Sequence, residues 1–423
     1  MKDKNDIREE IRQRILDGMD MSREYKDDEI YDLISREVSH TRRSYPLSLK
    51  ERLRLEEDIF NSLRKLDVLQ DLLEDPDITE IMVNGPDAIF YERGGAIFRY
   101  PGTFSSEEKL KDIIQTIVGK NNRVVNQASP IVDSRLSDGS RVNVVLSPVS
   151  IDGSALSIRK FPGTPMTMEQ LIRIGSLTKE AADLLGILVK ARYNIFISGG
   201  TGSGKTTFLN ALSQYIPTEE RIITIEDSAE LQLLEAENLI RLETRNATQD
   251  GVIAIAIRDL IRTALRMRPD RIIVGECRGE EALDMLTAMN TGHDGSLSTG
   301  HANSCRDIIA RLETMVIMGK ELPLHAIRSQ IASGIDIIIQ LGRLRDRSRR
   351  VLEIAEVDGI EAGEVRLHTL YRFREEPPTE EGEEMPGRPE LRRVEGGLQR
   401  EGRLLHREKL SFAGLEGGLP DGL

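Results

Sequence analysis

The stretch Gly199-Gly200-Thr201-Gly202-Ser203-Gly204-Lys205-Thr206 decides the fold class of this chain of 423 residues. It satisfies the pattern G-x-x-x-x-G-K-[ST] at every fixed position. An apolar run at 195–197 precedes it, and the run that follows places apolar residues at helical spacing: Phe208, Leu209, Leu212 and Ile216. A strand, a glycine-rich loop and a helix in this order predict a P-loop, the backbone cradle that binds nucleotide phosphates.

Each residue type in the P-loop has an expected task. The glycines let the backbone wrap the β-phosphate, and several N–H groups point inward at it. Lys205 should reach the β- and γ-phosphates, and Thr206 should ligate Mg²⁺. The predicted ligands are therefore ATP and Mg²⁺. The predicted binding residues are Gly199, Gly200, Thr201, Gly202, Ser203, Gly204, Lys205, Thr206 and Thr207.

The composition limits what kind of protein this is. The formal net charge is −13, which disfavours broad binding to nucleic acid because that affinity comes from clustered Lys and Arg. Only Cys277 and Cys305 are present, so neither a disulfide framework nor a four-cysteine zinc site can form. The N-terminus lacks an apolar signal segment, and no run of about 18 apolar residues occurs. We therefore expect a cytoplasmic protein that reaches a membrane only through partners.

The first 160 residues divide into two predicted parts. Residues 1–66 form helices with densely charged polar faces, either as a small helical domain or as a partner-binding arm. Residues 67–160 form a compact α+β domain, in which a helix begins at Ser105. The strands predicted in this domain cover residues 78–83, 88–91, 141–146 and 155–158.

The remainder divides into three parts. Residues 161–175 form a linker that begins with two prolines and a glycine. Residues 176–373 alternate helices and short apolar strands, which predicts an α/β domain with a mostly parallel sheet covered on both faces. Residues 374–423 begin with a run rich in Glu and Pro and form an acidic, disordered tail.

Two apolar strands of the α/β domain end in acidic residues. Residues 222–225 run into Glu226 and Asp227, and residues 272–275 run into Glu276. In open α/β sheets, ligands bind at the carboxyl ends of the strands. A P-loop enzyme needs one carboxylate near Mg²⁺ and one group that orients or activates water. Glu226 and Glu276 are the candidates for these two tasks.

Two histidines follow these acidic residues along the chain. A neutral imidazole can donate to a phosphate or hold a carboxylate, so His301 is a candidate sensor of the γ-phosphate. A zinc site is an alternative that requires His293, His301, Cys277 and Cys305 to converge, although their spacing matches no standard zinc finger. In the third interpretation both histidines are ordinary turn residues.

The order of the motifs resembles the secretion ATPase superfamily of type II secretion, type IV secretion and type IV pilus machines. The motifs are the P-loop, TIED at 224–227, RPDRIIVGECR at 268–278 and STGHA at 298–302. The stretches IMVNGP at 81–86 and YERGG at 91–95 are most similar to the CpaF-like branch, which serves tight-adherence (Tad or Flp) pili. The resemblance spans residues 65–372.

This resemblance implies a RecA-like P-loop domain, preceded by a PAS-like α+β domain and the helical region. It implies that Glu226 activates water and that His301 belongs to a histidine box. It places Glu276 on the Mg²⁺ side with Thr206, but its strand ends in Gly-Glu rather than in Asp, so we assign Glu276 no direct bond to the metal. The tail beyond Phe373 contains no motif that the resemblance places.

The resemblance also implies how the protein assembles. Arginines of the α+β domain reach the phosphates in this family, and Arg141 and Arg159 match their positions. The implied assembly is a homo-hexamer on the cytoplasmic face of the inner membrane. It hydrolyses ATP and drives a membrane-embedded pilus or secretion platform, with no nucleic acid as partner.

Several alternatives remain at this point. A type IV secretion ATPase that exports protein or DNA shares all of these motifs. A DNA-translocating RecA-like ATPase and a scaffold that binds ATP with little turnover are more distant rivals. An arginine cluster at 343–350 is either a solvated hairpin tip or a contact for acidic partners or lipid head groups; its members are Arg343, Arg345, Arg347, Arg349 and Arg350.

Overall fold

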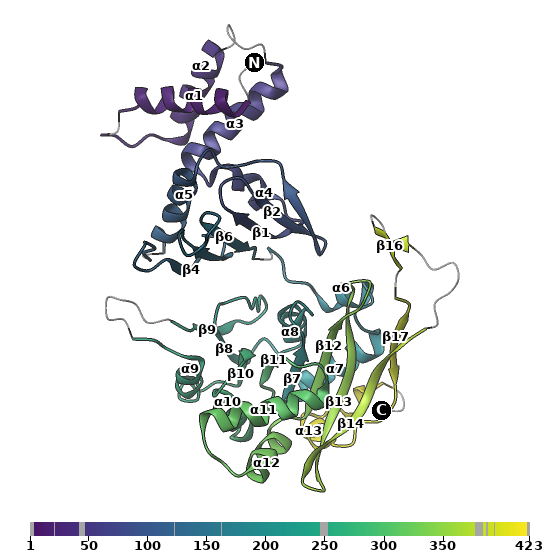
Figure 1. The fold of residues 1–423 in the computed structure, drawn as a ribbon. Helices are drawn as coiled ribbons and strands as arrows, with labels where there is room; N and C mark the ends of the chain where they lie inside the picture. Colours follow the sequence, from purple (N-terminus) through teal and green to yellow (C-terminus); the bar gives the residue numbers. More distant parts are fainter. Residues whose placement is uncertain are drawn as a thin grey trace. The chain divides into compact units, whose positions relative to one another are not determined.

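The computed structural model describes residues 4–20, 22–41, 47–121, 123–161, 163–245, 253–376, 384–385, 388–392 and 394–420. The chain divides into two compact units, Met1–Gly163 and Thr164–Leu423 (Figure 1). The predicted helical region and α+β domain both lie in the first unit, and the P-loop lies in the second. Over the described ranges, no helix has both the length and the apolar character needed to cross a membrane.

The first unit begins with three helices that pack through apolar stripes. They are α1 (Lys4–Gly18), α2 (Asp27–Thr41) and α3 (Leu49–Arg64). Ser48 and Glu51 form the predicted capping box at the start of α3. The buried members of the shared cluster are Ile7, Ile11, Ile15, Ile30, Ile34, Val38, Ile59 and Phe60.

A six-stranded antiparallel sheet follows, in the order β3-β2-β1-β6-β5-β4. Its strands are β1 (Ile78–Asn84), β2 (Ile89–Arg93), β3 (Ala96–Tyr100), β4 (Ile131–Arg135), β5 (Arg141–Val145) and β6 (Ala155–Arg159). The 3-10 turn η1 (Asp67–Leu69) and helix α4 (Gln70–Glu74) lead into it, and helix α5 (Glu107–Gly119) packs on it. The α+β prediction is confirmed, although the N-cap of α5 is Ser106 rather than Ser105, because the Ser106 side chain accepts from the backbone N–H of Lys109.

The helical region is joined to the α+β part by buried charges. Asp67 in η1 is buried, and its carboxylate lies 3.5 Å from the guanidinium of Arg8 and 3.8 Å from the ammonium of Lys109. Lys109 also donates to the carbonyl of Ser62 in α3. Burying these charges is costly unless they stay paired, so the contacts hold the helices against the α+β part of the first unit.

The second unit is built on a nine-stranded sheet in the order β17-β14-β13-β12-β7-β11-β10-β8-β9. The strands from β12 to β9 are parallel, as predicted, and the other three are antiparallel. Their bounds are β7 (Ile195–Gly199), β8 (Arg221–Glu226), β9 (Asn238–Glu243), β10 (Arg271–Cys277), β11 (Leu297–Gly300), β12 (Ile337–Arg343), β13 (Arg349–Glu361), β14 (Glu364–Glu375) and β17 (Gly396–Arg400). A separate pair consists of β15 (Glu384–Met385) and β16 (Arg388–Arg392).

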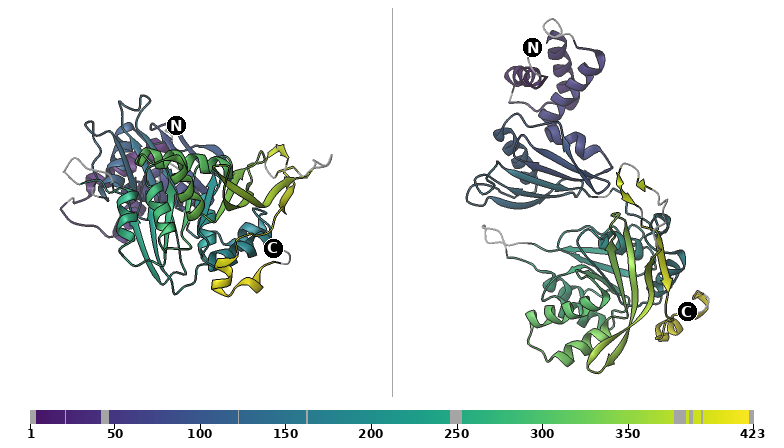
Figure 2. Two further views of the ribbon diagram at one scale, coloured as in Figure 1. Left: turned by 90° about the horizontal axis from the view of Figure 1, so that it is seen from below. Right: turned by 45° about the vertical axis from the view of Figure 1, so that its right-hand side comes forward.

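Helices cover both faces of this sheet (Figures 1 and 2). Alternate residues of β7 point to opposite faces, so Ile195 and Ile197 join one cluster and Phe196 joins the other. One face packs against α6 (Met168–Arg173), α7 (Lys179–Lys190) and α8 (Lys205–Ser213). The other packs against α9 (Ile257–Ala264), α10 (Ala282–Asn290), α11 (Cys305–Gly319) and α12 (Leu324–Gly334).

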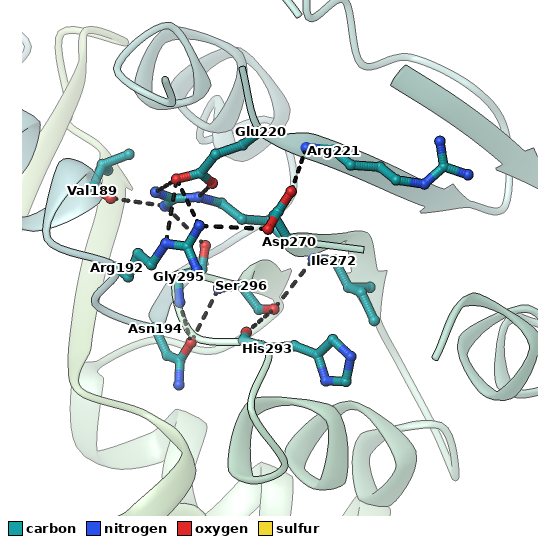
Figure 3. Close-up of polar contacts among 11 residues, drawn as sticks. Val189, Arg192, Asn194, Glu220, Arg221, Asp270, Ile272, His293, Gly295 and Ser296 are labelled. Carbon is teal, nitrogen blue, oxygen red and sulfur yellow. Dashed lines mark hydrogen bonds and ion pairs between the residues drawn. The ribbon is translucent and has the colours of Figure 1, made fainter. Parts of the chain in front are cut away.

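A buried polar network fixes the amino ends of the central strands (Figure 3). Arg271, the first residue of β10, has no exposed side-chain surface and binds both carboxylate oxygens of Glu220. It also donates to the carbonyls of Val189 and Gly295. The side chain of Asn194 accepts from the backbone N–H groups of Gly295 and Ser296, at 2.9 and 3.0 Å. With its donors matched in this way, the buried guanidinium ties β10 to the segments before β8 and β11.

The predicted linker is shorter than expected. The boundary between the two units falls between Gly163 and Thr164, and most of the stretch 161–175 belongs to the second unit. Residues 168–173 form α6, which begins with a capping box between Thr167 and Gln170. Met168 and Leu171 are buried, so this short helix is held by packing as well as by its cap.

The predicted disordered tail is also wrong in part. The run 377–383, which lies within its Glu- and Pro-rich start, is outside the described residues. Beyond it, β17 pairs with β14, and helix α13 (Glu408–Ala413) follows, with the 3-10 turn η2 (Glu416–Gly418) near the end. Leu398, Leu404 and Leu410 are buried in the main core of the second unit. Lys409 pairs with Asp336 at 2.6 Å and fastens α13 beside that core.

Replacing Leu410 by Ala should lower the free energy of unfolding of the second unit by about 2–5 kcal/mol, because it leaves a cavity in a packed core. Phe412→Ala is the matched control, since the Phe412 side chain in the same helix is 92% exposed. Urea denaturation followed by circular dichroism measures both variants. Equal stabilities would contradict the docking of α13.

Candidate active site

The P-loop connects β7 to α8 as the sequence predicts. Gly204 is the N-cap of α8 and has a φ of 94°, a left-handed conformation that favours glycine. Gly199 is required for a different reason. A Cβ there would lie 2.5 Å from the hydroxyl of Ser203 and 2.8 Å from the carbonyl of Leu341. The loop therefore closes tightly on itself and on β12, as a phosphate cradle needs.

The ammonium of Lys205 lies at the centre of the site. The side chain is buried, and Nζ donates to the carbonyls of Gly199 and Gly200, at 3.2 and 3.3 Å. The same atom lies 3.2 Å from Nδ1 of His301. Lys205 is thus held inside the loop that is predicted to receive the phosphates.

His301 links Lys205 to a carboxylate. Nε2 of His301 lies 2.5 Å from Oε1 of Glu276, and the other oxygen of Glu276 accepts from Arg278 at 2.6 Å. Partial burial, together with the charge of Lys205, holds the pKa of His301 below its usual value despite the neighbouring carboxylate. The lowered pKa favours the neutral form of the ring. Lys205 can only donate, so Nδ1 accepts from it, and Nε2 faces Oε1 of Glu276 at contact distance.

Glu226, the last residue of β8, is enclosed by the protein. Its Oε2 accepts from the backbone N–H groups of Glu230 and Leu231, at 2.8 and 2.9 Å. Its Oε1 is buried and, among the described residues, has no hydrogen-bond partner. Gly275 of β10 makes room, because a Cβ there would lie 2.8 Å from Cγ of Glu226. Burial raises the pKa of Glu226 to about 7, against the two N–H groups, which lower it.

The sheet explains why these side chains gather. Strands β7, β11, β10 and β8 are parallel neighbours, so their carboxyl ends lie along one edge of the sheet. That edge carries the P-loop after β7, His301 after β11, Glu276 near the end of β10 and Glu226 at the end of β8. The structure thus joins Lys205, His301 and Glu276 by direct contacts, and places Glu226 against β10. Thr206 and Thr207 lie in the first turn of α8. The catalytic and metal-binding roles themselves remain predictions.

Arg141 and Arg159 lie in the first unit. They are direct cross-strand partners on β5 and β6, so they project from the same face of that sheet. Arg159 is exposed and Arg141 is half-buried. The two arginines are therefore neighbours on one face of the sheet. Their role at the phosphates remains a prediction.

The residues of the alternative zinc site are spread through the second unit. His293 precedes β11 and His301 follows it, so the two lie at opposite ends of that strand. Figure 3 shows His293 beside the network at the amino ends, where its carbonyl accepts from Ser296. Cys277 is buried against Met315, and Cys305 is buried near the carbonyl of Ile338. Among the described residues, no group of three or more potential metal ligands of the His, Cys, Asp or Glu type is found.

Sequence reasoning missed two arginines at this edge. Arg278 donates to Glu276 and, at 3.2 Å, to Asp227, so it joins the two acidic motifs. Its position two residues after Glu276 was a usable signal. Arg349 belongs to the arginine cluster at 343–350, and its Nε donates to the carbonyl of Gly202 at 3.0 Å. Arg350 is buried, so the solvated-tip interpretation fails for that member, whereas Arg349 is exposed.

A parallel sheet covered on both faces, with a P-loop after β7 and acidic residues at neighbouring strand ends, defines a P-loop nucleotide-binding protein of the RecA-like class. The family described as "Type II/IV secretion system protein" matches residues 63–376. The chain belongs to this family.

Individual relatives agree with this placement. A putative conjugal transfer protein of Mycobacterium tuberculosis is 35% identical over 310 residues, which cover 72% of this chain and 87% of the relative. The type IV secretion system protein VirB11 of Brucella suis is 33% identical, over 65% of this chain and 84% of the relative. The type IV secretion system protein PtlH of Bordetella pertussis is 33% identical, over 70% and 95%.

Two solved structures support the fold. The ATPase DotB of Legionella pneumophila aligns with a TM-score of 0.51 and 22% identity, over 69% of this chain and 80% of that chain. The pilus retraction motor PilT, solved with bound ADP, aligns with a TM-score of 0.51 and 21% identity, over 72% and 81%. These similarities support a fold for this chain in which an N-terminal domain precedes a RecA-like domain.

The raised pKa of Glu226 should appear as a pH-dependent stability. Between pH 4.5 and about 7, the unfolded chain ionises this side chain while the folded chain keeps it protonated, so stability falls as pH rises. The Glu226→Gln side chain cannot ionise. The free energy of unfolding of this variant, minus that of wild type, should therefore increase by about a few kcal/mol from pH 4.5 to about 7 and then stay constant. Urea denaturation at a series of pH values measures this difference. Glu219→Gln, at an exposed site, is the control. A difference that is independent of pH would contradict the assignment.

Proposed function

We propose that this chain hydrolyses ATP and is a motor subunit of a type II/IV secretion-class machine. The observation that carries the proposal is a pair of contacts beside a complete P-loop: Lys205 contacts His301, and His301 contacts Glu276. A loop that only shaped a turn would not need a buried lysine linked to a carboxylate two strands away.

The residues at this edge fit a magnesium nucleotide. Thr206 supplies a hydroxyl in the first turn of α8 and Glu276 supplies carboxylate oxygens, and Mg²⁺ prefers oxygen ligands. We propose that these two residues hold the metal, Thr206 directly and Glu276 through water. The ion would neutralise charge on the phosphate oxygens. The backbone of the loop and Lys205 would bind and orient the β- and γ-phosphates.

Glu226 is the proposed general base. Its Oε1 is buried without a hydrogen-bond donor among the described residues, so a lone pair is available for a water proton. Two backbone N–H groups hold the other oxygen and fix the carboxylate. A pKa of about 7 lies near the operating pH, where a general base works best.

His301 is the proposed sensor. In the arrangement described, its Nδ1 accepts from Lys205. A γ-phosphate is a stronger acceptor than a neutral imidazole, so Lys205 would turn toward the nucleotide and release the ring. With a triphosphate bound, His301 would contact Glu276 without Lys205. With a diphosphate bound, His301 would contact both.

We further propose that the protein works as a homo-hexamer attached to an inner-membrane platform from the cytoplasmic side. The motifs at 81–86 and 91–95 favour the tight-adherence pilus branch. The named relatives favour a second candidate, an export ATPase of a type IV secretion system.

Deleting the gene distinguishes the pilus motor from the export ATPase, because loss of pili supports the first candidate and loss of exported substrate supports the second. Hydrolysis stimulated by DNA would instead favour a DNA translocase.

Lys205→Ala should abolish ATP hydrolysis and weaken nucleotide binding, because the γ-phosphate charge loses its mobile cation. Glu226→Gln should bind ATP normally but turn over more slowly, by roughly 10²-fold or more. Release of inorganic phosphate measures turnover. Wild-type rates in Lys205→Ala would refute the P-loop assignment. A loss in Glu276→Gln with none in Glu226→Gln would exchange the two carboxylate roles.

Arg141→Ala and Arg159→Ala should each reduce turnover strongly while the protein stays folded, since we propose that both arginines offset charge on the γ-phosphate. Arg99→Ala is the control, because Arg99 is an exposed arginine of β3 in the same unit. Small-angle scattering should detect compaction by ATP in wild type and in the control, but not in the two variants. Normal hydrolysis with normal compaction in both would exclude this mechanism.

A further inference from the structure

The hairpin formed by β12 and β13 runs beside the P-loop. β12 is the parallel neighbour of β7, and Leu341 pairs with Gly199, the first residue of the loop. Two residues further along β12, Arg343 pairs with Arg349 of β13. The hairpin therefore turns at the same edge of the sheet as the glycine-rich loop, with β12 between β13 and β7.

Arg349 makes a direct contact with the P-loop backbone. Its Nε donates to the carbonyl of Gly202 at 3.0 Å. Its stem passes Gly204, where an added Cβ would lie 3.5 Å from Cδ of Arg349. Gly202 and Gly204 have φ values of 70° and 94°, so this arginine spans the part of the loop with the least intrinsic preference for one conformation.

The hairpin that carries Arg349 is itself held on both sides of this residue. Asp346 is buried and accepts from the backbone N–H groups of Ser348, at 2.9 Å, and Val394, at 2.8 Å. Arg350 is buried and donates to the carbonyl of Gly175 at 2.5 Å. The backbone at Arg349 is therefore fixed to the start of the second unit and to the C-terminal segment.

We propose that Arg349 is a positioning residue for nucleotide binding, which acts through the carbonyl of Gly202. A carbonyl that is held outward leaves the N–H groups of the loop free to point inward at the β-phosphate of a nucleoside di- or triphosphate. A hydrogen bond to a charged donor is worth enough to bias a glycine-rich loop toward one conformation. The inference rests on the proposed binding of ATP.

The test uses the full chain and three variants. Arg349→Met keeps the stem over Gly204 and removes the donor, Arg349→Lys restores a cationic donor, and Arg345→Met is the matched control. Arg345 is an exposed arginine of the same hairpin, paired with Glu375 rather than with the loop. Hydrogen exchange of a peptide covering 199–206 is measured without nucleotide. Affinity is measured by titration with fluorescently labelled ADP, and thermal unfolding is followed in parallel.

Arg349→Met should speed exchange in the P-loop peptide and weaken ADP binding by about tenfold, the loss of one charged hydrogen bond. Arg349→Lys should recover part of both, Arg345→Met should match wild type, and the melting temperatures should agree. Wild-type exchange in Arg349→Met would overturn the proposal, as would a common fall in melting temperature with no rescue by lysine. If wild type itself fails to bind ADP, the proposed function fails, while the exchange experiment still decides the role of Arg349.

Discussion

The site depends on the balance of one buried positive charge. The ammonium of Lys205 lies inside the P-loop, and a charge in that position needs acceptors. Two loop carbonyls and Nδ1 of His301 supply them, and His301 passes the interaction on to Glu276. This arrangement requires β11 beside β7 and β10 beside β11, which is the observed strand order. The need to pair the Lys205 ammonium therefore links the order of the strands to the side chains found at their carboxyl ends.

The elements around this edge keep the strands in register. At the amino ends, Arg271 binds Glu220 and neighbouring carbonyls, so a slip of β10 would leave a buried guanidinium without acceptors. At the other side of the P-loop, the β12–β13 hairpin reaches Gly202 and is tied to the C-terminal segment through Asp346. The segment after β14 therefore contributes to the nucleotide-binding unit, although the family match ends at residue 376.

Most of the parallel sheet and the P-loop followed from local pattern, because apolar strands and a glycine-rich motif are short-range signals. The acidic and histidine residues could be placed at one edge, since parallel strands end together. What failed depended on tertiary contacts. In the tail, Leu398, Leu404 and Leu410 are six residues apart, too widely spaced to define a helix or strand face by themselves, and their burial follows from packing in the core of the second unit. Arg349 is exposed like Arg343, Arg345 and Arg347, and its partner is a backbone carbonyl 147 residues earlier in the chain, which no local pattern reveals.

The central claim is that Lys205 is shared between His301 and the nucleotide, and a structure bound to a non-hydrolysable ATP analogue with Mg²⁺ tests it most directly. The account predicts the β- and γ-phosphates inside residues 199–206, with Nζ of Lys205 on a phosphate oxygen and no longer within hydrogen-bond distance of Nδ1 of His301. An analogue bound elsewhere would contradict the account. So would a Lys205–His301 contact that persists at 3.2 Å beside an ordered γ-phosphate.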